Sequence, residues 1–272
     1  MARLLSSLLL ILLCSNAWAF DVVTGGGYST VNNFMDDADC VAVYRFEDGA
    51  LTTDSRNATP QTLTNSGTVT ADTSVFVEGA ASSLYNGTNQ YFYRNDSDLI
   101  STFPLKNGTT NNICTMCAWV RIDDAPDEST ENIIIRKYGG GTDDKRSFSL
   151  GISDALAVSL LLGVDGGADL DPHTHGSTLD AATWYFVCGS YENSGETIAI
   201  RVRSSAGAVV GTDYTGNLTG TFNIEDSPFT IGAAKASGGT VDYWDGRIDL
   251  AVVFKRVLTA DEVTRISKGI FP

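Results

Sequence analysis

Basic residues and long apolar runs are both scarce in this sequence. Its 272 residues include 18 Lys and Arg against 33 Asp and Glu, which gives a formal net charge of −15. Because no basic stripe is available to neutralise phosphates, the composition argues against duplex nucleic acid as a partner. The apolar stretch at residues 4–13 is shorter than the roughly 20 residues that a membrane-spanning helix needs.

The amino terminus instead has the order of a secretory signal peptide. Arg3 gives a basic start, residues 4–13 form the apolar segment, and Ala17-Trp18-Ala19 supplies a small-x-small cleavage site. We therefore predict a signal peptide at residues 1–19, a mature chain beginning at Phe20, and a secreted or cell-surface protein without a membrane span once the signal is removed. An uncleaved membrane anchor is the alternative, which the short apolar stretch disfavours.

Histidine and cysteine are too few to indicate a metal centre. The only histidines, His173 and His175, have no third ligand in view, and we predict that they lie in a solvated loop. A zinc site built from C-x-x-C motifs uses two such pairs, and this sequence has one. Cys14 leaves with the signal peptide, and an even number of remaining cysteines in a secreted chain predicts two disulfides. The candidates are Cys40, Cys114, Cys117 and Cys188.

The spacing of the cysteines narrows the pairing but does not decide it. Cys114 and Cys117 lie three apart in a strand-like run, so their side chains point to opposite faces and a bridge between them is disfavoured. Each is therefore expected to pair with Cys40 or Cys188, in either order.

Short apolar or alternating runs, separated by Gly, Asn, Asp and Ser, begin at Cys40 and indicate an all-β domain. They occupy residues 40–46, 83–85, 90–93, 113–122, 133–138, 148–152, 157–164, 184–191, 198–202, 229–233 and 248–254. The only predicted helix is residues 259–268, with Thr259 as N-cap and Glu262 three residues later.

The alternation also predicts which residues face the core. In residues 113–122 the better core face carries Cys114, Met116, Ala118, Val120 and Ile122. Trp119 then lies on the opposite side unless a bulge shifts the register.

The segment at residues 20–39 is rich in Gly, Asn and Asp and predicts an extended lead-in. It is expected to pair with a sheet edge of its own domain. The alternative is that it pairs with the edge of a neighbouring molecule, which is a route to self-assembly.

Several sequence blocks, taken in order over residues 40–268, resemble one family. The blocks are Gly79-x4-Leu84-Tyr85-Asn86-Gly87-x3-Tyr91-Phe92, Cys117-Ala118-Trp119-Val120-Arg121, Trp184-Tyr185-Phe186-Val187, Phe229-Thr230-Ile231-Gly232-Ala233, and Asp245-Gly246-Arg247-Ile248-Asp249 followed by residues 254–262. Together they resemble the laminin-G-like (pentraxin-like) jelly-roll branch of the concanavalin-A-like lectins and glucanases. The resemblance implies a two-sheet antiparallel β-sandwich over residues 40–272, with the short helix covering one end.

The resemblance also implies a non-catalytic recognition domain that binds a carbohydrate or glycoprotein. Enzymatic members carry a Glu-x-Asp-x-x-Glu pattern, whose acids alternate onto one face of a strand, and this chain lacks it. A structural surface protein that self-assembles through residues 20–39 and its sheet edges is the alternative function, and a glycoside hydrolase or lyase is the least favoured. Aromatic faces stack on sugar rings, so the candidate carbohydrate-binding residues are Tyr243, Trp244 and Tyr214.

Calcium is the cofactor that the resemblance implies. Asp249 matches an acidic ligand of the last strand, and Glu47, Asp48 and Asp54 follow the first strand, where further ligands are expected. Asp54-Ser55-Arg56-Asn57 stands where relatives often have a Gly-rich turn, so a plain acidic turn is the alternative. Sequons for N-glycosylation begin at Asn57, Asn86, Asn95, Asn107 and Asn217.

Overall fold

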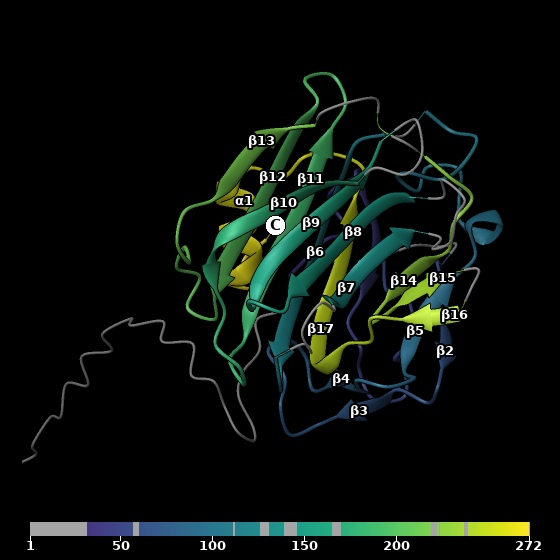
Figure 1. The fold of residues 1–272 in the computed structure, drawn as a ribbon. Coiled ribbons are helices and arrows are strands. Elements are labelled where there is room, and N and C mark those ends of the chain that lie inside the picture. Colours follow the sequence, from purple (N-terminus) through teal and green to yellow (C-terminus); the bar gives the residue numbers. More distant parts are fainter. Residues whose placement is uncertain are drawn as a thin grey trace, which may run out of the picture.

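The computed structural model describes residues 32–56, 60–110, 112–125, 131–138, 146–164, 170–218, 222, 224–236 and 239–271. The predicted signal peptide, residues 20–31 of the lead-in segment and the sequon at Asn57 lie outside these residues. Within them, two antiparallel sheets stack face to face (Figure 1), which confirms the predicted β-sandwich. In the described ranges, no helix is both long and apolar enough to cross a bilayer.

Sheet A has the strand order β13-β12-β11-β6-β17-β4-β3, and β1 also pairs with β17. Its strands are β1 (Cys40–Tyr44), β3 (Thr70–Asp72), β4 (Ser82–Asn86), β6 (Cys114–Ile122), β11 (Tyr185–Glu192), β12 (Thr197–Ser204), β13 (Tyr214–Asn217) and β17 (Asp245–Phe254).

Sheet B has the order β10-β9-β8-β7-β14-β5-β2. Its strands are β2 (Thr64–Ser66), β5 (Tyr91–Arg94), β7 (Glu131–Tyr138), β8 (Arg146–Ser153), β9 (Ala157–Gly163), β10 (Leu170–Thr178) and β14 (Phe229–Ile231). A separate hairpin pairs β15 (Ala234–Ala236) with β16 (Gly239–Val241). The helical elements of the described residues are the 3-10 turn η1 (Asp96–Asp98) and α1 (Ala260–Ser267).

The main core lies between the sheets and follows the alternation of the sequence. Met116, Ala118 and Val120 of β6 belong to it, together with Phe148 and Leu150 of β8. Each strand therefore buries alternate side chains against the opposite sheet, as two stacked sheets require. The predicted core face of residues 113–122 is confirmed.

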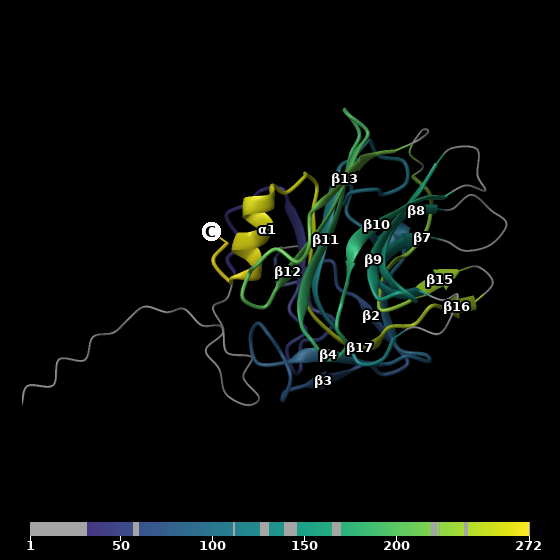
Figure 2. The same cartoon turned by 60° about the vertical axis from the view of Figure 1, so that its left-hand side comes forward.

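A second core covers the outer face of sheet A. Trp119 lies on that face, as the alternation predicted, but it is only 1% exposed because it packs in a cluster with Phe34, Val263 and Ile266. Helix α1 lies flat against this face rather than at one end of the sandwich (Figure 2), which corrects the predicted position of the helix. The central strands β6 and β11 of sheet A are thus buried on both faces.

Helix α1 begins where its capping residues predicted. The Thr259 hydroxyl accepts a hydrogen bond from the Glu262 backbone N–H at 3.2 Å, and the Glu262 carboxylate accepts one from the Thr259 N–H at 2.7 Å. Arg256 adds a bond to the same carboxylate at 2.7 Å. Because these contacts are local in the sequence, the start of the helix could be located without the fold.

The described part of the lead-in segment contacts the carboxyl-terminal end of the described chain. The Asn32 side chain donates to Glu78 Oε2 at 2.7 Å and to the Ile266 carbonyl at 3.0 Å, and it accepts from the Phe271 N–H at 3.0 Å. Residues 32–39 form turns over the outer face of sheet A and contain no strand. The expected pairing with a sheet edge is therefore not made by these eight residues.

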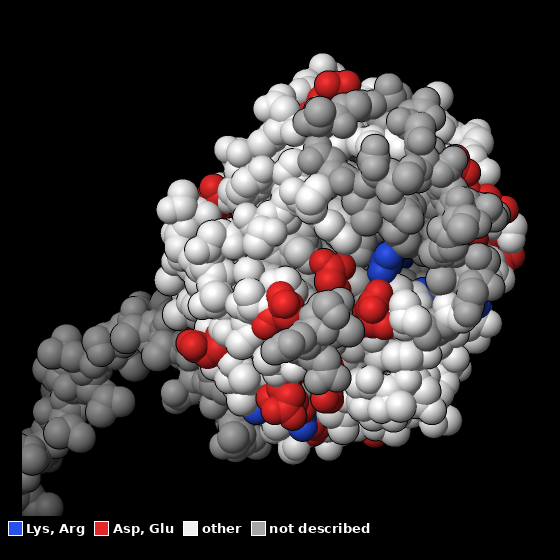
Figure 3. Space-filling model, viewed as in Figure 1, with Lys and Arg blue, Asp and Glu red and all other residues white. Residues whose placement is uncertain are grey.

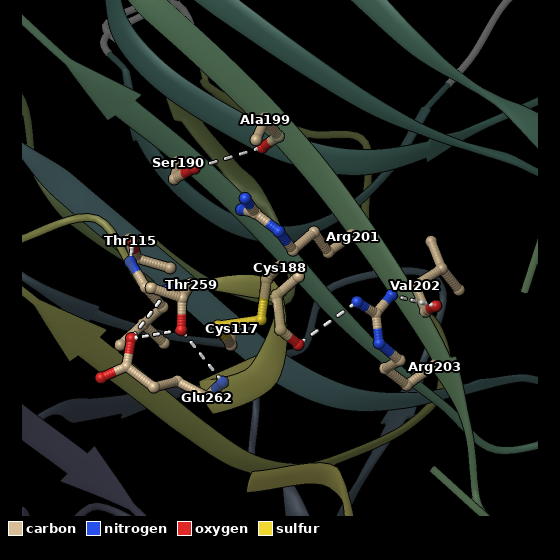
Figure 4. Close-up of a disulfide and its surroundings, with 12 residues drawn as sticks. Thr115, Cys117, Cys188, Ser190, Ala199, Arg201, Val202, Arg203, Thr259 and Glu262 are labelled. Atoms are coloured by element: carbon tan, nitrogen blue, oxygen red, sulfur yellow. Dashed lines mark hydrogen bonds between the residues drawn. A yellow bond between two sulfur atoms is a disulfide. The ribbon is translucent and has the colours of Figure 1, made fainter. Parts of the chain in front are cut away.

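The cysteines form one of the predicted bridges and leave two thiols. Cys117 of β6 and Cys188 of β11 stand directly opposite each other and are joined by a disulfide (Figure 4). Cys40 and Cys114 are free and buried. Cys114 points into the main core and Cys40 into the second core, so sheet A separates them and the expected second disulfide does not form.

Candidate functional site

The outer face of sheet B carries a transverse row of polar side chains. Thr64, Tyr93, Thr230, Arg136 and Ser149 are paired in register across β2, β5, β14, β7 and β8. Their strand neighbours Phe92, Ile231, Ile135 and Phe148 point into the main core. The alternation of each strand therefore places the row on the face directed away from the core.

Three members of this row are buried although they face outward. Arg136 is 6% exposed, and Thr230 and Ser149 are each 1% exposed. The Thr230 hydroxyl donates to the Ala233 carbonyl at 2.6 Å. The Arg136 guanidinium donates to Asp242 Oδ2 at 3.4 Å. A buried polar row is costly to maintain unless it is hydrogen-bonded, so it marks this face as a candidate for function.

Two carboxyl groups flank Arg136. Burial raises the pKa of Asp242, and the charge of Arg136 offsets part of that shift. Burial likewise raises the pKa of Glu131, against a hydrogen bond from Ser159 and the charge of Arg136, and Asp242 raises it further. Raised carboxyl pKa values around one buried cation are typical of ligand-binding and catalytic sites. From this side, a few acidic side chains are scattered over a surface that is mostly uncharged, and still fewer Lys and Arg atoms are visible (Figure 3).

Tyrosines border the same face. The ring centroids of Tyr91 and Tyr93 on β5 are 5.8 Å apart, and Tyr243 lies 6.2 Å from Tyr91. Lys235 of β15 places its ammonium group 3.3 Å from the centre of the Tyr93 ring. This cation occupies one side of Tyr93, so the half-buried Tyr243 is the better stacking surface for a ligand.

The other two predicted carbohydrate-binding aromatics lie elsewhere. Trp244 is 0% exposed and belongs to the main core, so it is not available to a ligand and its prediction is wrong. The Tyr214 hydroxyl forms a 2.8 Å hydrogen bond with His173 Nδ1 at the edge of the sandwich, between β13 and β10. His173 and His175 are 7% and 1% exposed on β10, not in a solvated loop.

The structure brings two of the four predicted calcium ligands toward each other. Asp249 is fully buried, and its Oδ2 accepts hydrogen bonds from the Val77 and Glu78 N–H groups at 2.7 and 2.9 Å. Its Oδ1 has no hydrogen-bond partner among the described residues. Burial raises the pKa of Asp249, and the nearby charge of Glu47 raises it further. A buried oxygen without a partner beside a second carboxylate fits a hard cation.

The other two acidic candidates do not join this pair. Asp54 accepts backbone hydrogen bonds from Val43, Arg56 and Gln61 at 2.9–3.0 Å, so its carboxylate organises the turn after β1. Asp48 is exposed. Across the described ranges, no three His, Cys, Asp or Glu side chains gather as a metal centre. Further calcium ligands from the described residues would therefore be backbone carbonyls or uncharged side-chain oxygens, together with water.

Four of the predicted glycosylation sites lie on the surface. Asn86, Asn95, Asn107 and Asn217 are all exposed. Asn86 also accepts backbone hydrogen bonds from Thr88 and Asn89 at 3.1 and 3.2 Å. Glycosylation itself stays a prediction.

The architecture defines the class of protein as an antiparallel jelly-roll β-sandwich. The family model described as the concanavalin A-like lectin/glucanases superfamily, laminin G type, matches residues 86–264. The chain belongs to this superfamily, which confirms the resemblance drawn from the sequence blocks. No curated protein matches the chain.

Solved structures share the fold at low sequence identity. The binding domain of botulinum neurotoxin DC, in complex with rat synaptotagmin II, aligns with a TM-score of 0.59 and 12% identity over 85% of this chain and 52% of that one. This chain thus spans about half the length of the toxin binding domain. Domain 4 of an extracellular GH43 arabinanase from Geobacillus stearothermophilus, in complex with arabinotriose, aligns at 0.54 and 18% identity over 84% of this chain and 98% of that one.

Enzymes also contain this fold. Trypanosoma rangeli sialidase in complex with sialic acid aligns with a TM-score of 0.55 and 15% identity, over 86% of this chain and 33% of that one. The fold is therefore shared by binding domains and by parts of enzymes.

Reasoning from the sequence did not single out Arg136, Glu131 or Tyr93 as site residues. The run 90–93 places two tyrosines on the same face of one strand, and residues 133–138 place a basic residue after an apolar run. Those two signals were visible. The sequence does not show that β5 and β7 lie on either side of β14, because register between distant strands is a tertiary property.

Proposed function

We propose that this protein is a secreted, non-catalytic recognition domain that binds carbohydrate on the outer face of sheet B. The observation that carries the proposal is the pair of Arg136 and the partly exposed Asp242 at the border of the polar row, with the half-buried Tyr243 beside it. Sugar hydroxyls both donate and accept hydrogen bonds, so they can pair with guanidinium and carboxylate groups together. Tyr243 would stack on a ring face.

Relatives of similar fold guide the choice of ligand to screen. The arabinanase domain was solved with arabinotriose and the sialidase with sialic acid. Linear and acidic oligosaccharides are therefore screened first, on a glycan array followed by calorimetry. Incubating the same oligosaccharides with the protein and analysing the products tests the hydrolase or lyase alternative in one experiment.

The variants Arg136→Gln and Tyr243→Ala test the location. Each should weaken binding at least about tenfold, the equivalent of 1.4 kcal/mol. Lys255→Gln removes a cation that follows β17 and pairs with Asp39, away from this face, and serves as the control that keeps wild-type affinity. Binding that survives both variants, or an array without any ligand at high micromolar concentration, would reject the proposal.

Calcium support is a second part of the proposal, and it rests on Asp249 and Glu47. The ion would neutralise two neighbouring carboxylates and satisfy the partnerless Asp249 Oδ1. Calcium is titrated calorimetrically into chelator-treated protein, with and without Asp249→Ala. We expect heat and a higher melting temperature for the wild type only. No heat and an unchanged melting temperature would end the calcium proposal and leave the carbohydrate proposal standing.

Self-association remains the alternative. Asn32 and Phe34 contact residues 266 and 271 of the same chain, so residues 20–31 are the part of the segment left to test for self-association. Size-exclusion chromatography of the mature chain and of a form lacking residues 20–31 distinguishes the two. A single monomer peak in both supports the recognition domain, and large assemblies that the deletion dissolves support the alternative.

A further inference from the structure

A groove of about 350 Å³ lies on the outer face of sheet A, on the opposite side of the sandwich from the candidate face. Strands β11, β12 and β13 line it together with the segment before α1. The residues that matter are Ser190, Ala199, Arg201, Thr215, Asn217 and Val257. Its volume falls within the range of small-molecule sites and accommodates one or two sugar rings.

Among the described residues that line this groove, Arg201 is the only charged side chain, and the carboxylate nearest to it is bonded to another arginine. Asp213 receives two hydrogen bonds from Arg203, at 2.6 and 2.9 Å. Arg201 Nε lies 3.5 Å from Asp213 Oδ2, and this buried nitrogen makes no hydrogen bond within the described residues. Two guanidinium groups therefore share one carboxylate, which leaves a net positive charge in a protein with a net charge of −15.

The direction of the Arg201 side chain suits a ligand in the groove. Figure 4 shows its guanidinium extending along the outer face toward Ser190, away from Arg203. Burial lowers the pKa of Arg201, and so does the neighbouring charge of Arg203, while Asp213 raises it. A guanidinium nevertheless stays charged in proteins, so the group presents a fork of N–H donors without a dedicated partner.

We propose that this groove binds a carboxylate-bearing saccharide, such as a uronic acid unit, through Arg201. An arginine fork matches the two oxygens of a carboxylate, which gives both affinity and orientation. The hydroxyls of Ser190 and Thr215 and the amide oxygen of Asn217 line the rest of the groove and suit ring hydroxyls. Ser190 is weakly engaged, since its bond to the Ala199 carbonyl is 3.5 Å long.

The lining favours a sugar acid over a fatty acid or a bare anion. A fatty acid requires a continuous apolar channel, whereas this groove combines an arginine with hydroxyl and amide groups and has Val257 on one wall. A bare anion uses the charge but none of the hydroxyls. This second site stands independently of the carbohydrate proposal for sheet B, because the two share no residue.

The test uses D-glucuronate as the probe and glucose and acetate as matched controls. The mature chain is produced without glycans, because Asn217 begins a sequon and lines the groove. In a nitrogen-edited NMR titration, glucuronate should shift the Arg201 Nε–H and the amides of Thr215 and Gly216 saturably, with a Kd of roughly 1–10 mM. Glucose and acetate should each bind at least tenfold more weakly.

Variants assign the binding to this groove. Arg201→Gln should reduce glucuronate affinity at least tenfold, and Thr215→Val, which keeps the side-chain volume, about threefold. The bidentate Arg203–Asp213 pair remains in both, so their folding is checked by melting temperature. Lys255→Gln is the control, because Lys255 pairs with Asp39 outside both proposed sites and its loss should leave glucuronate binding unchanged. Arg136→Gln tells this groove from the sheet B face.

Three results would overturn the proposal. Equal binding of glucose and glucuronate would remove the role of the carboxylate. Equal binding of acetate would reduce the groove to a simple anion site. Glucuronate binding lost in Arg136→Gln but retained in Arg201→Gln would move the ligand to sheet B, an outcome that supports the proposed function while rejecting this inference.

Discussion

Removing the Cys117–Cys188 disulfide should destabilise the fold by an amount set by the chain it encloses. The bridge joins residues 71 apart in the sequence. In the native state the two cysteines are already opposite each other on β6 and β11, so the bond adds little to their alignment. Its main effect is to restrict the unfolded chain, and the loop-entropy relation for about 70 residues gives roughly 4 kcal/mol.

The size of this effect can be measured by thermal unfolding. For a domain of this length, each kcal/mol corresponds to about 2–4 °C, so the reduced protein should melt about 8–16 °C below the oxidised one. Because the bridge is buried, reduction is carried out in denaturant and the protein is refolded in the reductant. The double variant Cys117→Ala/Cys188→Ala should melt close to the reduced wild type.

One control makes the experiment decisive. Burial raises the pKa of the Cys40 and Cys114 thiols to about 12, so few thiolates are present to exchange with the bridge. The double variant lacks this bridge, so adding reductant to it should change nothing. If oxidised and reduced wild type melt within about 2 °C of each other, the entropic account of this bridge is wrong.

Three further changes test the second core and the buried charges. Asn32→Ala removes three side-chain hydrogen bonds and should cost about 2–4 kcal/mol in denaturant unfolding; a loss below 0.5 kcal/mol would contradict the anchoring role. Burial alone would raise the pKa of Glu262, but hydrogen bonds from Arg256 and Thr259 lower it to about 2. The stability from its charge is present above the unfolded pKa near 4.5 and lost as pH falls toward 2, so Glu262→Gln should cost about 1–2 kcal/mol at pH 7 and nearly nothing at pH 2. Burial raises the pKa of Asp249, so the folded protein is stabilised by protonation of this carboxyl and loses that stability as pH rises. In chelator, the stability of Asp249→Asn relative to the wild type should therefore increase with pH. A difference in stability that stays constant between pH 3 and 8 would refute the raised pKa.

The burial of Trp244 could have been predicted from the alternation of the strand that follows it. Trp244 was predicted to bind carbohydrate, yet this residue and Ile248 lie an even number of residues apart and both point into the main core. Gly246 between them has φ +131, and a Cβ there would collide with the Arg121 carbonyl. Extending the alternation back from Ile248 predicts a buried tryptophan.

Local patterns determined much of this protein. The alternation in residues 113–122 fixed the inner face of β6, and the capping box fixed the start of α1, because both depend on residues close together in the chain. The ordered sequence blocks, which end at residues 254–262, sufficed to identify the family.

Only the tertiary structure decided what covers the outer face of sheet A, which cysteines meet, and which polar groups share a site. Trp119 is buried because α1 and residues 32–34 return to it from both ends of the described chain. Arg136 donates a hydrogen bond to Asp242, and Arg203 rather than Arg201 donates hydrogen bonds to Asp213. Both are contacts between separate elements. Such contacts depend on strand register and on the docking of distant segments, and the period of a single strand carries no information about either.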